Sequence, residues 1–199
     1  MKKSNFRLIC CVYAVIIIND LKERNDSDNK MKEDTLLDFQ NAVRRLPSMY
    51  LNNSKVLQMN CYIQHGHITT YQHCINVMVI SFAIARAFKL FGFHIDLPAL
   101  LIGALLHDFY LYDWHDGRMR PEGLHGFSHP LVAKENAEKY FNVNPKILNI
   151  IESHMFPMTI NHLPKSKEAV IVGIADKYCA IKETLHPTKG WFAATNISL

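Results

Sequence analysis

Residues 99–114, "ALLIGALLHDFYLYDW", restrict the fold of this chain more than any other segment. His107 and Asp108 stand side by side at the end of a run that is otherwise apolar or glycine. Burying either side chain without a partner costs several kcal/mol, and a charged carboxylate costs more. The pair therefore needs compensation, and the candidates are a structural salt bridge, a catalytic acid and base, or a bound metal ion.

Apolar residues recur at helical spacing through most of the chain. Residues 69–91 carry the stripe His73, Val77, Ile80, Ile84 and Phe88, which predicts a helix in the core. The predicted helix starts are Asp34, Asp96 with Pro98, Ser128 with Pro130, Asn144 with Pro145, and Ser166. Convincing strand alternation and hairpin turn signals are absent from the sequence. We therefore predict an all-α fold.

The chain has 199 residues, 49% of them hydrophobic, which is enough for one well-buried domain. We place this domain at residues 34–186 and interpret residues 187–199 as a tail. Residues 1–33 combine an apolar segment with a charged linker, and we expect them to lie outside the fold. The apolar segment follows two lysines as in a secretory signal, but it lacks a cleavage site and is too short to span a bilayer. Membrane association is expected only if this segment is retained.

Charge and cysteine content narrow the class of partner and the compartment. The net charge of +4 comes from 22 basic and 18 acidic residues spread thinly along the chain. This pattern gives no reason to expect nucleic-acid binding, whereas an anionic small molecule would not be repelled. The five cysteines have no C-x-x-C spacing, which favours reduced thiols in a cytoplasmic protein. The 11 histidines favour imidazole and carboxylate ligands for any metal.

Four polar residues occupy apolar faces of three predicted helices: His73, His107, Asp108 and Asp176. Taken singly, each is explained by a hydrogen-bonded core histidine or a buried salt bridge. Asp176, however, follows "AVIVGIA", and the nearest cations, Lys177 and Lys182, lie on other helix faces. Imidazoles and carboxylates both suit a divalent cation, which would resolve every burial problem at once. We therefore predict that the four residues bind a metal ion together.

His129 and His154 extend this set, because each lies near the end of a predicted helix. Residues at the rim of a helical bundle can reach a second ion near its centre. Surface histidines at these two positions are an equal alternative from the residues alone.

The ordered series of these six residues resembles the HD superfamily of metal-dependent phosphohydrolases. The resemblance covers about residues 60–185 and rests also on the segments "YQHCINVMVISFAIA", "GALLHD", "HPLVAKENAEKYF" and "IADKYCAIKE". It implies an HD-domain helical bundle with two divalent ions, drawn from manganese, magnesium, cobalt, nickel or iron. The implied first metal is held by His73, His107, Asp108 and Asp176. The implied second metal is held by His129 and His154, with Asp108 bridging the two.

The resemblance also implies an activity, the hydrolysis of a phosphomonoester, nucleotide or phosphodiester by a metal-activated water. His107 and Asp108 are then catalytic residues as well as ligands. Lys177, Lys134 and Arg118 are expected to hold the phosphate. His65, His67 or His125 is expected to protonate the leaving group.

The sequence differs from many members of this superfamily at two motifs, and two other functions are alternatives to phosphohydrolase activity. "HDFY" stands where many relatives have HDIG, and "GLHGFSHP" lacks the GYP signature, which argues against a cyclic dinucleotide substrate. Some relatives with the same six residues resemble di-iron oxygenases. A non-catalytic ligand-binding domain is the third interpretation, although retention of all six residues argues against it.

Overall fold

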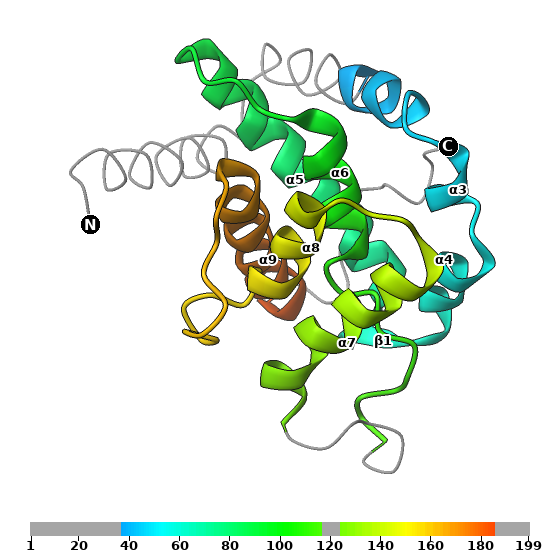
Figure 1. Ribbon diagram of the computed structural model, residues 1–199. Helices are drawn as coiled ribbons and strands as arrows, with labels where there is room; N and C mark the ends of the chain where they lie inside the picture. The colour runs from blue at the N-terminus through cyan, green and yellow to red at the C-terminus, as the bar shows by residue number, and fades with distance from the viewer. Residues whose placement is uncertain (1–36, 117–123, 186–199) are drawn as a thin grey trace.

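The computed structural model describes residues 37–116 and 124–185 (Figure 1). Within these ranges the chain forms a bundle of α-helices with one small hairpin, so the predicted all-α class is confirmed. In chain order the elements are a helix at residues 37–44, α3 (Ser48–Leu51), α4 (Ser54–Gln58), the 3₁₀ helix η1 (Met59–Cys61), β1 (Ile63–His65), β2 (Ile68–Thr69), α5 (Thr70–Leu90), α6 (Leu97–Leu106), α7 (His125–Tyr140), α8 (Pro145–Ser153) and α9 (Lys167–Leu185). The predicted segment 1–33, the Asp34 cap and the tail 187–199 lie outside the described residues.

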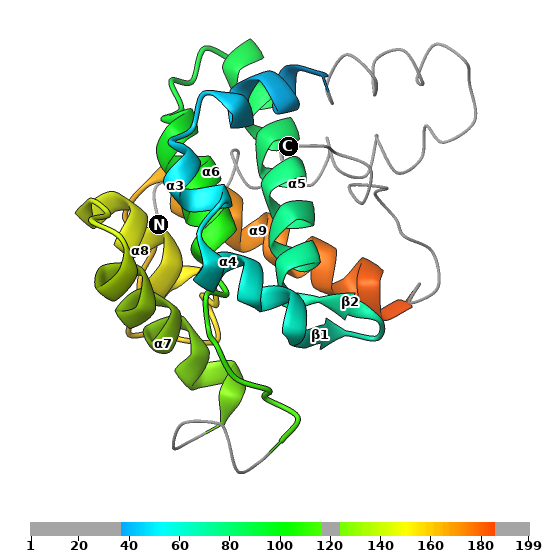
Figure 2. The same cartoon turned by 90° about the vertical axis from the view of Figure 1, so that its right-hand side faces the viewer.

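Helix α5 is the central element of the bundle, and it packs against α6 and α9 (Figure 2). It begins with a capping box, in which the Thr69 hydroxyl accepts from the Gln72 backbone N–H and the Gln72 side chain accepts from the Thr69 N–H. This helix is long and apolar enough to cross a membrane, but most of it is buried against other helices of the domain. The prediction of a core helix at residues 69–91 is therefore confirmed.

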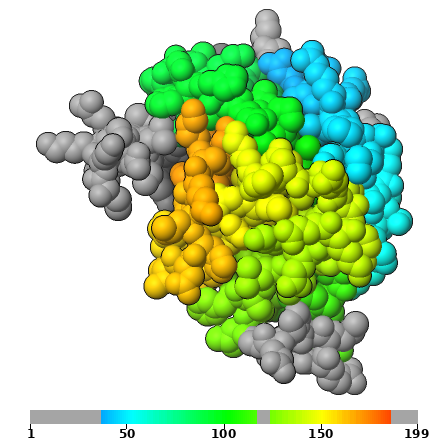
Figure 3. All heavy atoms as spheres, viewed as in Figure 1, coloured from blue at the N-terminus to red at the C-terminus, as the bar shows by residue number. Residues whose placement is uncertain are grey.

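Helix α8 packs against α6, α7 and α9. The space-filling view shows α7 and α8 packed together over the middle of one face (Figure 3). Gly103 permits the approach of α6 to α8, because a Cβ atom at this position would lie 2.6 Å from Ile150 Cγ2. The ends of α6 and α8 consequently lie close to each other and to the middle of α9.

Three of the predicted helix starts are confirmed by side-chain caps. Asp96 accepts from the Ala99 N–H, Asn144 from the Ile147 N–H, and Ser166 from the Ala169 N–H. These bonds satisfy backbone donors that have no partner within the first turn.

The predicted start of α7 at Ser128 and Pro130 is wrong. Helix α7 begins at His125, because the Leu124 carbonyl already accepts from the backbone N–H groups of Phe127 and Ser128. Pro130 therefore lies inside the helix, where the hydrogen bond that its missing N–H would make is lost.

The hairpin of β1 and β2 was not expected from the sequence. The two strands pair antiparallel, and Gly66 adopts a φ of 57° in the turn between them, a conformation that favours glycine. With three and two residues, the strands are too short for an alternating pattern to show. The hairpin precedes α5 and contacts α9 (Figure 2), and it carries Gln64, whose side chain is buried.

Candidate metal centre

Five elements bring the six predicted metal ligands into one buried cluster. His73 lies on α5, His129 on α7 and Asp176 on α9, while His107 and His154 are the C-cap residues of α6 and α8. Asp108 follows His107 directly. None of the six residues is more than 7% exposed. The spatial convergence that the sequence predicts is present, including both rim histidines.

The first half of the cluster is built around Asp176. The His73 Nε2 atom lies 3.1 Å from Asp176 Oδ1, and the His107 Nε2 atom lies 3.6 Å from the same oxygen. One oxygen of the Asp108 carboxylate, Oδ2, lies 3.8 Å from His73 Nε2 and 3.5 Å from His107 Nε2. Two imidazole nitrogens and two carboxylate oxygens thus face a common point.

The second half of the cluster is built on the other oxygen of Asp108. Oδ1 lies 3.2 Å from His129 Nε2 and 3.5 Å from His154 Nε2. The two histidine nitrogens are 2.9 Å apart. Asp108 therefore directs its two oxygens at two different pairs of imidazoles.

Backbone carbonyl groups orient three of the four imidazole rings. The Nδ1 atoms of His107, His129 and His154 lie 2.8, 2.7 and 2.7 Å from carbonyl oxygens of the preceding turn of the same chain. A carbonyl oxygen only accepts, so each Nδ1 carries the hydrogen and donates it. Each Nε2 atom is thereby left directed at the cluster, which is the arrangement that a metal-binding histidine requires.

The residues of the cluster fit a divalent metal ion. Among the described residues, His107 Nε2 and Asp108 Oδ1 are buried without a hydrogen-bond partner, which ordinarily costs about 1–3 kcal/mol for each atom. Ligand atoms of His73, His107 and Asp176 lie within 4.8 Å of one another, as do those of His107, Asp108 and His154. Nitrogen and oxygen donors of this kind suit the divalent first-row transition metals.

Three of the histidines of the cluster have pKa values shifted in opposite directions. Burial favours neutral His73, but hydrogen bonds to Asp176 and Glu183 outweigh it and raise the pKa of His73 to about 10. Burial also opposes charge on His107, yet Asp108 raises its pKa well above the usual value. Burial, with His107 and His129, lowers the pKa of His154 to about 3. Protons on His73 and His107 thus balance the carboxylates, and a bound metal ion would displace such protons.

The two aspartates are held in the charged form. Burial alone would raise the pKa of Asp176, but contacts with His107 and His73 hold it well below its ordinary value. For Asp108, burial is outweighed by His107 and His129, and its pKa is also lowered. Without partners, burial would have raised the pKa of Asp176. The contacts with His107 and His73 stabilise its charged form, and this explains how a carboxylate can stand on an apolar helix face.

Two buried residues that the sequence reasoning missed contact this cluster. The Gln64 side-chain amide on β1 donates to Asp108 Oδ2 at 2.7 Å, and the Tyr110 hydroxyl donates to Gln64 Oε1. The Glu183 carboxylate contacts His73 Nδ1. Gln64 has no recognisable sequence signal, whereas Glu183 lies two helical turns after Asp176 on the same face of α9, a spacing that could have revealed it.

The structure engages two of the predicted phosphate-binding residues in other contacts. Lys134 Nζ lies 2.6 Å from Glu152 Oε2. Lys177 Nζ donates to the carbonyl oxygens of His154 and Gly173. These contacts support structural roles for both amines and give no support to phosphate binding. Arg118, the third predicted residue, lies outside the described residues.

Comparison with known protein families matches residues 70–181 with the HD domain. The match covers more than half of the chain and contains all six residues of the cluster. The class of protein is thus a helical domain of a superfamily of metal-dependent hydrolases. This chain belongs to the HD domain family. Neither the search of curated proteins nor the search of solved structures found a match.

Proposed function

We propose that this protein is a metal-dependent phosphohydrolase that acts on an anionic small molecule, namely a phosphomonoester, a nucleotide or a phosphodiester. The observation that carries the proposal is the position of Asp108, whose two oxygens face two separate sets of imidazole nitrogens. A shared carboxylate between two ligand sets is suited to a two-metal centre, a common arrangement in phosphatases and nucleases.

The six residues divide into two ligand sets in this proposal. His73, His107, Asp108 and Asp176 hold one ion, and His129 and His154 hold the other together with Asp108. Bound divalent ions would lower the pKa of a water molecule and neutralise charge on the phosphate oxygens. The protein contributes a buried setting with pre-oriented nitrogens, so little reorganisation accompanies binding.

Two further imidazoles flank the cluster and are candidates for protonating the leaving group. The His65 ring lies with its centroid 5.4 Å from that of His73, and the His125 ring stacks on His129 at 4.7 Å. Burial and the neighbouring His73 lower the pKa of His65, so this ring is a poor proton donor near pH 7. We therefore assign the proton transfer to His125, and we expect His125→Gln to lower kcat more than His65→Gln does.

The test starts with protein purified without oxygen, whose metal content is measured before any metal is added. Phosphate release is then screened over phosphomonoesters, nucleotides and phosphodiesters with manganese, magnesium or cobalt. We expect two ions per chain and metal-dependent release that falls at least about a thousandfold in Asp108→Asn. Glu138→Gln, a substitution of an exposed residue on α7, is purified and assayed in the same way as the control and should keep its metal and its activity.

Three results would contradict the proposal. Activity that survives Asp108→Asn would show that the cluster is not the catalytic site. An absolute requirement for iron with oxygen uptake and no phosphate release would favour oxygenase chemistry. Tight ligand binding by the metal-loaded protein without turnover of any phosphate ester would indicate a binding domain.

A further inference from the structure

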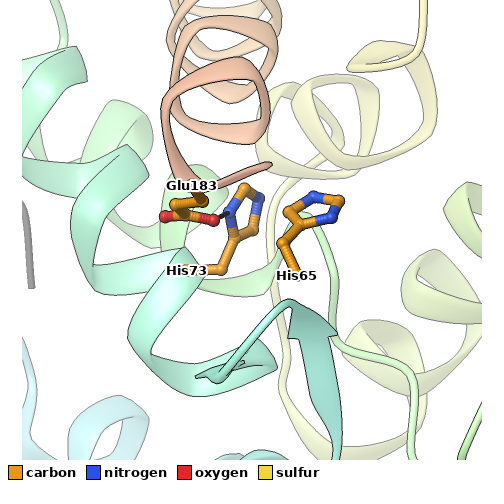
Figure 4. Close-up of side chains that lie close together, drawn as sticks. All are labelled: His65, His73 and Glu183. Atoms are coloured by element: carbon orange, nitrogen blue, oxygen red, sulfur yellow. Dashed lines mark hydrogen bonds and ion pairs between the residues drawn. The ribbon is translucent and has the colours of Figure 1, made fainter. Parts of the chain in front are cut away.

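Glu183 is a buried carboxylate next to the candidate metal centre. It lies near the end of α9, is 3% exposed, and falls beyond the region that matches the HD domain. Its Oε2 atom lies 2.8 Å from His73 Nδ1 (Figure 4), and its Oε1 atom accepts a hydrogen bond of 2.8 Å from the Asn76 side-chain amide. Both carboxylate oxygens are thus occupied by groups from α5.

The contact with Glu183 distinguishes His73 from the other three histidines of the cluster. The Nδ1 atoms of His107, His129 and His154 donate to neutral backbone carbonyls, whereas that of His73 donates to a charged carboxylate. A hydrogen bond to an ionised acceptor is about twice as strong as a neutral one. It also makes the imidazole a more basic ligand through its opposite nitrogen.

The orientation of the His73 ring directs its second nitrogen, Nε2, at the cluster. With Nδ1 donating to Glu183, the opposite nitrogen, Nε2, faces Asp176 Oδ1 at 3.1 Å. Rotation of the ring would break both contacts at once. His65 lies on the other side of the ring and approaches it edge-on, so it restricts the ring without bonding to Nδ1 (Figure 4).

Asn76 completes the arrangement from the same helix as His73. The two residues are three positions apart on α5, so their side chains lie on one face and reach the same carboxylate. The hydrogen bond from the Asn76 side-chain amide to Glu183 Oε1 fixes the plane of the carboxylate, which leaves Oε2 directed at the imidazole of His73.

We propose that Glu183, held by Asn76, is a positioning residue that fixes the orientation and tautomer of His73 and thereby strengthens binding of the ion held by His73, His107, Asp108 and Asp176. This inference rests on the proposed metal centre. It goes beyond that proposal because only one of the two ligand sets contains a histidine that donates to a buried carboxylate. The half formed by His129 and His154 relies on backbone carbonyls and does not depend on Glu183.

The test compares Glu183→Gln with Glu168→Gln. Both glutamates lie on α9 and are buried, but Glu168 accepts from the Asp96 backbone N–H and has no contact with the cluster. Mn²⁺ and Co²⁺ binding to the full chain is measured by titration calorimetry. We expect Glu183→Gln to weaken one of the two binding steps about 10–100-fold and to leave the other unchanged. We expect Glu168→Gln to leave both steps unchanged.

A second readout reports the tautomer directly. In zinc-loaded protein with ¹⁵N-labelled histidine, the Nδ1 proton of His73 is expected far downfield, and this signal is lost in Glu183→Ala. Asn76→Ala is expected to weaken the same binding step by a smaller factor. Circular dichroism establishes that each variant is folded before metal is added.

The outcomes separate this inference from the proposed function. If Glu183→Gln binds both ions like the unchanged protein, or loses no more affinity than Glu168→Gln, the positioning role is wrong even where phosphate is released. If one binding step weakens as expected and no phosphate ester is hydrolysed by the unchanged protein, the positioning role stands and the proposed function fails.

Discussion

The Nε2 atoms of His129 and His154 lie 2.9 Å apart, although the Nδ1 atom of each ring donates to a backbone carbonyl. When both rings are neutral, two lone pairs therefore face each other across this short distance. Asp108 Oδ1, 3.2 Å from His129 Nε2, adds a third electron-rich atom to the same space. Such an arrangement is unfavourable without positive charge, which a bound divalent cation would supply.

Removal of metal is expected to destabilise the folded protein. A metal ion that binds only the folded state at about 100 times its Kd adds about 2.7 kcal/mol to the free energy of unfolding. Thermal unfolding after dialysis against a chelator, with and without added Mn²⁺, measures this difference. The melting temperature of Asp108→Asn should hardly respond to Mn²⁺, because both ligand sets lose a carboxylate oxygen. A melting temperature of the unchanged protein that is indifferent to Mn²⁺, Co²⁺ and Zn²⁺ would contradict a metal centre.

Loss of one rim histidine is expected to remove one ion and spare the other. His129→Ala deletes a ligand of the second set only, since its Nε2 atom contacts His154 and Asp108 Oδ1. Elemental analysis should give about one bound ion per chain in place of about two. His94→Ala, an exposed histidine before α6, is the matched control and should retain both ions. A stoichiometry of two in His129→Ala would show that His129 is not a ligand.

Gly173 is expected to set the position of His154. A Cβ atom at residue 173 would lie 3.0 Å from the His154 carbonyl oxygen, a backbone atom that cannot move aside without shifting the end of α8. We expect Gly173→Ala to cost about 1–3 kcal/mol in unfolding free energy and to weaken metal binding. Gly126→Ala is the control, because its Cβ atom would meet no atom within 4 Å. Denaturant unfolding and metal titration of the two variants decide the point.

Lys177 and Lys134 are expected to differ in their effect on stability. Lys177 is half-buried, and burial lowers its pKa, while its amine bonds the His154 carbonyl at the end of α8. Lys177→Met should therefore reduce the free energy of unfolding by about 1–3 kcal/mol. Lys134→Met breaks a partly exposed ion pair with Glu152 and should cost no more than about 1 kcal/mol. A rise in KM without any loss of stability in Lys177→Met would instead support phosphate binding.

Tyr110→Phe is expected to disturb Asp108 through Gln64. The Tyr110 hydroxyl donates to Gln64 Oε1, and this bond turns the amide nitrogen toward Asp108 Oδ2. Its removal leaves a buried amide oxygen without this donor, which costs about 1–3 kcal/mol in unfolding free energy. Chemical denaturation measures the loss, and Tyr62→Phe, whose hydroxyl accepts from Gln58 near the surface, should cost less.

The family match and the helical fold agree with what could be predicted from local patterns in the sequence. The apolar stripe of α5 and the caps at Asp96, Asn144 and Ser166 depend on residues a few positions apart, so they can be predicted from the sequence alone. Four of the six polar residues, His73, His107, Asp108 and Asp176, stood out because each interrupts an apolar face. Their convergence was predicted from the burial cost that the four share, whereas His129 and His154 were added from their places at helix ends and from the family resemblance. The structure brings all six together.

Only the tertiary structure decided which atoms of these residues face one another. The division of Asp108 between two imidazole pairs depends on the packing of α5, α6, α7, α8 and α9 around it, and no local pattern records it. The contacts of Gln64 and Glu183 likewise join residues 44 and 110 positions apart. Hydrogen bonds form over about 3 Å whatever the distance along the chain, so partners of this kind appear only when the helices have packed.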